Sequence, residues 1–184
     1  MMPAAIPPIS PEHARAYAAL YRTHFAFVWR SLRRLGVEER ELPDGSQDVF
    51  LIVFRRLSEL DLEGKLTTWL YAVCLRVASD WRRRAHRRHE LVGVPDQLSE
   101  RPATGAHVGE LRDLLWRALD AMPMDQRAVF VAFELEGMTG DEIGTALALP
   151  TPTVHSRLRL ARARFRAVIE RERAREGKQF GGAR

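Results

Sequence analysis

The strongest constraint on the fold comes from residues 139–166, TGDEIGTALALPTPTVHSRLRLARARFR, which have the pattern of two helices joined by a very short turn. Thr139 precedes Glu142 by three residues, the capping-box spacing that marks a helix start. The first helix must end before Pro150, because proline cannot continue a helix. Two helices connected this closely are typical of a helix-turn-helix, whose second helix enters the major groove of DNA.

The second of these helices is expected to have Thr151 as its cap and Pro152 in its first turn, where a missing N–H costs nothing. Apolar residues recur along it at steps of three and four, which predicts a buried stripe of Val154, Leu158, Ala161, Phe165 and Val168. The residues between them point away from the stripe, where they can reach phosphates and base edges: Thr153, His155, Ser156, Arg157, Arg159 and Arg162. An ordinary amphipathic helix with a solvated charged face fits the pattern equally well.

The charge of the chain favours a polyanionic partner. Its 184 residues have a net charge of +5, and nearly all the basic charge is arginine, because Lys65 and Lys178 are the only lysines. Arginine binds phosphate and guanine through a planar fork that lysine lacks. A composition of 46% hydrophobic and 29% charged residues is that of a globular chain, so the excess of arginine indicates binding to nucleic acid or to a membrane surface.

Cysteine usage and the N-terminus indicate the compartment. Cys74 is the single cysteine and lies in an apolar helical run, so we expect a buried, inert thiol and a reducing environment. The N-terminal MMPAAIPPIS has no basic residue before a long apolar core, which argues against a signal peptide. No apolar run approaches the roughly 18 residues of a membrane span. We therefore expect a cytoplasmic protein without membrane insertion.

Helical periodicity without a strand signal runs through most of the chain, which predicts an all-α fold. Ser10 is expected to cap the first helix and Gly36 to end it. The periodicity is interrupted over residues 91–108, where prolines, glycines and scattered polar residues indicate a linker. We therefore predict two small helical domains, 10–90 and 109–176, on either side of it.

Two charged clusters lie in the N-terminal domain. An acidic patch at residues 38–48 leads into one apolar helix, and a later helix, expected from Leu66 or Thr67, becomes strongly basic over residues 82–88. The basic cluster suits the negative end of a helix dipole, and it can equally neutralise phosphates. The tryptophans in this helix, Trp69 and Trp81, favour nucleic acid because aromatic rings stack on unpaired bases, although both also fit a core.

Motifs of catalysis and metal binding are missing from the sequence. It has no G-x-S-x-G motif, no paired Cys and His arrangement and no Gly-rich phosphate loop. His86 and His89 are three residues apart, but arginines flank them and no cysteine is near, which argues against a metal site. We therefore expect neither an enzyme nor a cofactor or metal ion.

Motifs in both predicted domains resemble those of the extracytoplasmic-function (ECF, group IV) sigma factors of bacterial RNA polymerase. Residues 43–50, PDGSQDVF, match the pattern acidic, Leu, any residue, Gln, acidic, any residue, Phe. The match continues in Trp69-Leu70-Tyr71 and in Asp80-Trp81-Arg82-Arg83-Arg84. In the second domain it comprises Ala121-Met122-Pro123, Gln126-Arg127, Val129-Phe130, Glu136-Gly137-Met138-Thr139, Glu142-Ile143, Leu149-Pro150, residues 153–158 and Ala161-Arg162. The resemblance extends from about Tyr17 to Ile169, and the two sets of motifs are specific in combination.

This resemblance implies a promoter-specificity factor that binds core RNA polymerase, recognises a two-part promoter and nucleates DNA melting. Its region-two domain would bind polymerase through Asp44, Gln47 and Asp48, with Phe50 in the core. The same domain would bind and melt the minus-ten element through Lys65, Thr67, Thr68, Trp69, Arg76, Trp81, Arg82, Arg83 and Arg84. The region-four helix would read the minus-thirty-five element with His155, Ser156 and Arg159, while Arg157 and Arg162 hold phosphates. An anti-sigma factor is a further partner expected of the family.

Several positions depart from the family pattern. Gly45 stands where Leu is usual, which predicts a looser polymerase contact. Ala148 replaces a turn glycine, and because alanine tolerates a left-handed conformation poorly, we expect a reshaped turn. His155 and Leu160 replace basic residues and weaken the charge of the reading face.

Two other functions remain compatible with the residues alone. One is a stand-alone helix-turn-helix regulator that binds duplex DNA as a dimer, although such a protein would have no need of the acidic motif beside an aromatic and basic helix. The other is a basic helical interaction module without a sequence-specific role on DNA.

Overall fold

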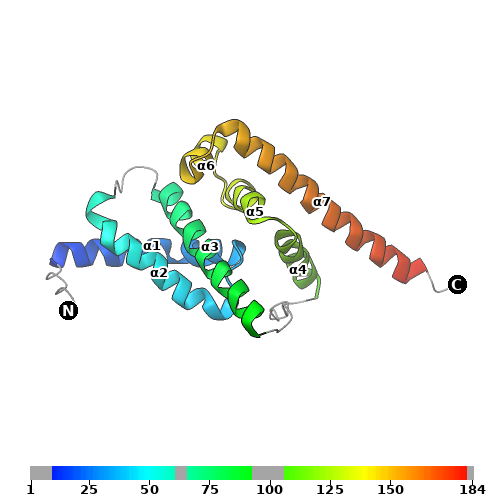
Figure 1. Ribbon diagram of the computed structural model, residues 1–184, viewed down its shortest axis with the longest axis horizontal. Coiled ribbons are helices and arrows are strands. Elements are labelled where there is room, and N and C mark those ends of the chain that lie inside the picture. The colour runs from blue at the N-terminus through cyan, green and yellow to red at the C-terminus, as the bar shows by residue number, and fades with distance from the viewer. Residues whose placement is uncertain (1–9, 61–65, 93–105, 182–184) are drawn as a thin grey trace.

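The computed structural model describes residues 10–60, 66–92 and 106–181, and these residues form helices joined by short turns (Figure 1). No β-strand occurs among them, so the all-α prediction is confirmed. The α-helices are α1 (Pro11–Arg34), α2 (Leu42–Arg56), α3 (Leu66–Val92), α4 (Ala106–Asp120), α5 (Met124–Phe130), α6 (Gly140–Leu147) and α7 (Thr151–Gly181). Short 3-10 turns, η1 (Glu39–Glu41) and η2 (Leu57–Glu59), flank α2, and a π-helical turn, η3 (Val131–Leu135), extends α5.

Helices α1, α2 and α3 pack against one another as a bundle. The Ser10 hydroxyl accepts a hydrogen bond from the His13 N–H at 3.2 Å, and the chain after α1 turns through Gly36 with φ of 94°. The predicted cap and stop of this helix are therefore confirmed. Phe50 is buried in the core of the bundle, as expected.

Helices α4, α5 and α6 each pack against the long helix α7. The predicted capping box is present, because Glu142 N–H donates to Thr139 Oγ1 at 3.3 Å and Thr139 N–H donates to Glu142 Oε2 at 2.8 Å. The expected Thr151 cap is wrong: α7 begins at Thr151 itself, whose hydroxyl donates to Asp141 Oδ1 at 3.0 Å. Pro152 is therefore the second residue of α7, and the bond from Thr151 to Asp141 links α7 to α6.

The turn between α6 and α7 keeps a left-handed residue. Ala148 has φ of 51° and ψ of 47°, and it follows the last residue of α6. The expectation that alanine would reshape this turn is therefore wrong. The N–H of Leu149 donates to Gly144 O at 2.9 Å, a bond that closes the end of α6.

The two helix groups share a core. Helix α6 packs against α3 (Figure 1). Buried side chains of α1, α3, α5 and η3 belong to one continuous cluster. Helix α3 extends to Val92 and α4 begins at Ala106, so both helices reach into the predicted linker 91–108. The rest of that linker, and the loop over residues 61–65, lie outside the described residues.

Candidate nucleic-acid and partner interfaces

One exposed face of α2 contains the three residues predicted to bind polymerase. Asp44 and Gln47 are exposed, whereas Asp48 is half-buried, and its Oδ2 accepts a hydrogen bond from Trp81 Nε1 at 3.0 Å. Leu51 lies one turn further along and is 44% exposed. Sequence reasoning missed Leu51, although its spacing from Asp44 and Gln47 places it on the same helix face. The face is therefore acidic with an apolar end.

Gly45 lies under this face, not on it. It is buried, and a Cβ at this position would lie 3.5 Å from Leu32 Cδ1 and 3.8 Å from Trp81 Nε1. The absence of a side chain leaves room for the Trp81 indole beside α2. The departure from the family's leucine therefore acts on the packing of α2 against α1 and α3, and on the indole that bonds Asp48.

The start of α3 is divided between the surface and the core. Thr67 is exposed, Thr68 is 6% exposed, and Trp69 is half-buried. Arg76, on a later turn, is exposed. Lys65 lies outside the described residues. Of the minus-ten residues near the start of α3 that the structure describes, Thr67 alone is exposed.

The basic end of α3 has several local partners. Arg83 pairs with Asp80, and Arg84 lies over the Trp81 ring at 5.4 Å from its centroid. Arg82 is half-buried and donates from Nη1 to the sulfur of Met124 at 3.7 Å. Because Arg84 covers one face of the Trp81 ring and Asp48 holds its N–H, a base that stacked on that face of Trp81 would have to displace Arg84.

The N-terminal half of α7 has the predicted two-sided character. Val154, Leu158 and Ala161 are buried, and Phe165 stacks on Phe130 at 5.2 Å, so the apolar stripe is confirmed. Opposite the stripe, four predicted DNA-facing residues are exposed: His155, Ser156, Arg159 and Arg162. The other two, Thr153 and Arg157, are half-buried.

Two arginines of this face are paired with acidic residues of the same helix group. Arg157 Nε lies 3.5 Å from Asp125 Oδ2. Arg162 Nε donates to Glu134 Oε1 at 2.6 Å, and its guanidinium lies over the Phe133 ring at 5.2 Å from the centroid. These pairs orient the two guanidiniums along the flank of α7.

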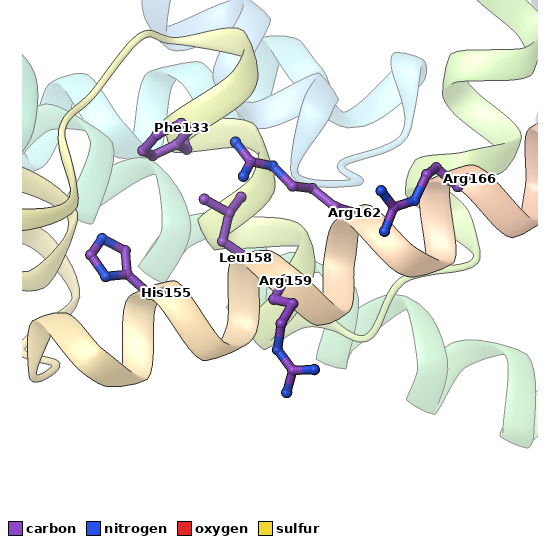
Figure 2. A pocket seen from close by; sticks show the side chains of 6 residues that line it. All are labelled: Phe133, His155, Leu158, Arg159, Arg162 and Arg166. Atoms are coloured by element: carbon purple, nitrogen blue, oxygen red, sulfur yellow. The ribbon is translucent and has the colours of Figure 1, made fainter.

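A shallow groove of about 430 Å³ runs between η3 and α7 (Figure 2). Leu158 and Phe133 form its apolar part, and the basic residues around it are His155, Arg159, Arg162 and Arg166. The His155 ring lies near the start of α6, where a Cβ on Gly140 would come within 2.9 Å of its Nε2. Gly140 therefore makes room for the histidine that replaces a family cation. Leu160, the other departure, is 43% exposed.

Neither thiol chemistry nor a metal cluster is apparent in the described parts of the chain. Cys74 is buried, and burial, followed by the negative charge of Glu136, raises the pKa of its thiol far above the usual value, which favours an unreactive side chain. Among the described residues, no three His, Cys, Asp or Glu side chains gather as metal ligands. None of the described helices has the length and apolarity needed to cross a bilayer.

Comparison with known families gives two matches, in chain order. Residues 20–88 match the model of sigma-70 region 2, and residues 112–165 match the model of sigma-70 region 4. Together the matches span most of the two helix groups, from α1 to α3 and from α4 to α7.

Curated relatives include sigma factors from several bacteria. The RNA polymerase sigma factor NccH of Alcaligenes xylosoxydans xylosoxydans is 26% identical over 162 residues, which cover 84% of this chain and 87% of that protein. The ECF sigma factor SigE of Mycolicibacterium smegmatis is 30% identical over 157 residues, or 82% of this chain and 60% of that protein. The ECF sigma-E factor of Escherichia coli K12 is 26% identical over 138 residues, 68% of this chain and 72% of that protein.

Two solved structures share the fold. One is CnrH in complex with the cytosolic domain of CnrY, with a TM-score of 0.63 and 23% identity over 85% of this chain and 89% of that one. The other is the sigma factor RpoE of Bartonella quintana in complex with the anti-sigma factor NepR, with a TM-score of 0.66 and 16% identity over 84% of this chain and 96% of that one. At these identities the likeness establishes the all-helical fold.

Proposed function

Because the chain belongs to the ECF sigma factors of RNA polymerase, we propose that its α2, α3 and α7 surfaces divide the work of transcription initiation between them. The protein is a transcription initiation factor that directs RNA polymerase to promoters. The observation that matters most is the match to sigma region 2 and sigma region 4 in one chain, in this order. It also disfavours a stand-alone regulator, which would have no use for region 2. We propose further that the factor is non-enzymatic, needs no cofactor and acts in the cytoplasm.

The α2 face is the proposed polymerase contact. Asp44, Gln47 and Asp48 form its polar part, and Leu51 adds an apolar contact at its end. An acidic face of this kind suits a basic partner surface, because complementary charge steers association and fixes orientation. The hydrogen bond from Trp81 holds one Asp48 oxygen and leaves the other for the partner.

The α3 surface is the proposed site for the melted minus-ten strand. Thr67, Trp69 and Arg76 lie along one part of the helix, and Arg82, Arg83 and Arg84 lie near its basic end. Lys65, by its position in the sequence, would join them. Arginines neutralise the strand's phosphates, while tryptophan rings suit unstacked bases. Binding of the open strand offsets unpairing, which costs about a few kcal/mol per flipped base.

The α7 surface is the proposed reader of the minus-thirty-five duplex. His155, Ser156 and Arg159 are exposed on the early turns and supply the base contacts, with Thr153 beside them. Arg157 and Arg162 supply phosphate contacts. Each of these two must exchange a carboxylate for a phosphate, so their net contribution to affinity is smaller than that of an unpaired arginine.

An anti-sigma factor is the proposed protein antagonist. The partners of the two structural neighbours, the cytosolic domain of CnrY and NepR, support this expectation from a likeness of fold. Such an antagonist would act by covering the polymerase contact, the DNA contacts or both.

Reconstituted transcription tests the proposed function. Core polymerase with the wild-type chain should initiate at promoters in genomic DNA that core alone ignores. Asp48→Arg and Asp44→Arg should each abolish holoenzyme formation in gel filtration, because they reverse the charge of the α2 face. Asp44 is exposed, so Asp44→Arg should disturb folding less than Asp48→Arg does. Glu59→Arg is the matched control: it makes the same kind of reversal at an exposed position on η2. Retained holoenzyme with Asp44→Arg and Asp48→Arg would refute the docking assignment.

A further inference from the structure

Leu160 is an exposed leucine on α7, the helix proposed to read the minus-thirty-five duplex. It is 43% exposed and stands where the family usually has a basic residue. Single exposed leucines are common on protein surfaces, so the neighbours of Leu160 decide whether it has a role. It belongs to a strip of α7, the outer ridge, whose members are all exposed and lie opposite the buried stripe: Ser156, Arg159, Leu160 and Ala163. As the side of α7 furthest from its buried stripe, the outer ridge is the part that a ligand meets first.

Basic residues lie on both flanks of the outer ridge. Arg157 and Arg162 are five residues apart, or about 140° around the helix axis, so they lie on opposite flanks. Arg157 pairs with Asp125 of α5. Arg162 pairs with Glu134 of η3, and Figure 2 shows Arg159 of the ridge pointing away from that side. The outer ridge is therefore a strip of mixed polarity between two positively charged flanks.

This arrangement matches the two kinds of group that the major groove of DNA presents. The groove is about 12 Å wide and admits one α-helix, with base edges along its floor and a sugar–phosphate strand on each side. The flanking arginines then face phosphates, and the outer ridge faces base edges. Leucine has no hydrogen-bond donor or acceptor in its side chain, so Leu160 cannot satisfy the polar atoms of a base edge. The apolar group on those edges is the C5-methyl group of thymine.

We propose that Leu160 is a specificity-determining residue of this chain, which packs on the C5-methyl group of one thymine in the minus-thirty-five element. This inference rests on the proposed function, because it takes α7 as the helix that reads duplex DNA. A cation at this position would bind phosphate or guanine, whereas Leu160 favours thymine and leaves a neighbouring base to Arg159. The loss of a charge from the reading face is therefore a change of base preference.

Replacement of single thymines by deoxyuridine tests the contact. Uracil pairs with adenine as thymine does and lacks only the C5-methyl group. The duplexes carry a promoter that the reconstituted holoenzyme selects from genomic DNA. The holoenzyme should bind one uracil-substituted duplex of the minus-thirty-five element about fourfold more weakly, which corresponds to about 0.8 kcal/mol for burial of one methyl-sized group. The ratio of the two affinities should not change with salt concentration, since both duplexes offer the same phosphate contacts.

Variants of Leu160 assign the contact to its side chain. Leu160→Ala should remove the sensitivity to uracil at that position, and folding should be unaffected because leucine and alanine both favour helix. Leu160→Met keeps an apolar side chain of similar size and should keep most of the fourfold ratio. Leu111→Ala is the matched control, because Leu111 is 63% exposed on α4 and its truncation should leave the ratio as in wild type.

The inference is overturned if no thymine of the element is sensitive to uracil, or if Leu160→Ala retains the sensitivity of wild type. Loss of the sensitivity in Leu160→Ala and Leu111→Ala alike would also overturn it, because the effect would then not belong to the outer ridge. A wild-type holoenzyme that recognises no promoter would instead refute the proposed function.

Discussion

The two proposed DNA surfaces consist of the same kind of structure, an arginine-rich helix, yet they differ in accessibility. On α7 the early turns expose His155, Ser156 and Arg159. On α3 Thr68 is buried and Arg82 contacts the other helix group. The proposed duplex reader is therefore accessible in the structure, whereas part of the proposed single-strand surface is covered.

The partners of the arginines differ in the same way. Arg157 and Arg162 pair with Asp125 and Glu134, which belong to their own helix group, so these pairs survive a separation of the groups. Arg82 contacts Met124 across the interface and loses that contact when the groups separate. Promoter reading by α7 should therefore be insensitive to a separation of the helix groups, whereas the α3 surface should respond to it.

The largest expected effect is on the open surface. Arg159→Ala should cost about 1–3 kcal/mol of binding free energy at one base position of the minus-thirty-five element if the guanidinium reads a base edge. Holoenzyme binding to a set of duplexes with single base changes measures this loss. Arg162→Ala should instead weaken all sequences alike and lower the salt dependence, as loss of a phosphate contact does.

Arg173→Ala provides the control for this comparison. Arg173 is exposed on the same helix, several turns beyond the reading face, so its replacement should leave the binding of every duplex unchanged. A uniform loss with Arg159→Ala, equal for all base changes, would contradict its role in base reading.

Elements whose signals are local were predictable from the sequence. The Ser10 cap, the Thr139–Glu142 capping box and the apolar stripe on α7 each depend on residues within a few turns of one another. Spacing along the chain encodes such features directly. The left-handed conformation of Ala148 was not predicted. The sequence shows the steric cost of that conformation for alanine, but it does not show the packing of α6 against α7 that stabilises the turn.

The contacts between the helix groups could not be predicted. Glu136 and Arg34 are separated by 102 positions, and Glu136 appears in the sequence as one more acid beside a turn glycine. Tyr71 and Ala128 are separated by 57. Trp81 and Asp48 are separated by 33 positions. The sequence pattern favoured stacking of Trp81 on DNA bases, and it gave no sign that the indole N–H donates to Asp48 on α2. Periodicity says which face of a helix is buried, not which distant helix covers it.

An intermediate effect is expected at the covered surface. Burial, and then the charge of Glu136, raise the pKa of Tyr71 well above its ordinary value. The folded chain therefore holds the phenolic proton more tightly than the unfolded chain does. Its stability is fully present below the ordinary pKa of about 10 and falls as the pH rises above that value. The thermal unfolding temperature should fall in that range, while tyrosinate absorbance rises.

Tyr71→Phe tests whether Tyr71 is the group that titrates. The variant lacks the hydroxyl bond to Ala128, so the folded chain should lose about 0.5–1.5 kcal/mol of stability at neutral pH. Above pH 10 it should show no further step of its own, while Tyr17→Phe, a change in a half-buried tyrosine of α1, should keep the step of the wild type. An unchanged alkaline loss of stability in Tyr71→Phe would show that another group causes it.

The smallest effect is expected in the turn that orients the open surface. The left-handed conformation of Ala148 has a steric cost that glycine lacks. Ala148→Gly should therefore raise the free energy of unfolding by about 0.4–1 kcal/mol, because relief of this strain outweighs the added entropy of the unfolded chain. Ala146→Gly makes the same change within α6 and should lower it by about 0.5–1 kcal/mol. Thermal unfolding distinguishes the opposite signs. Equal destabilisation by both would mean that the left-handed conformation at Ala148 is free of strain, in which case α6 and α7 would owe their angle to packing alone.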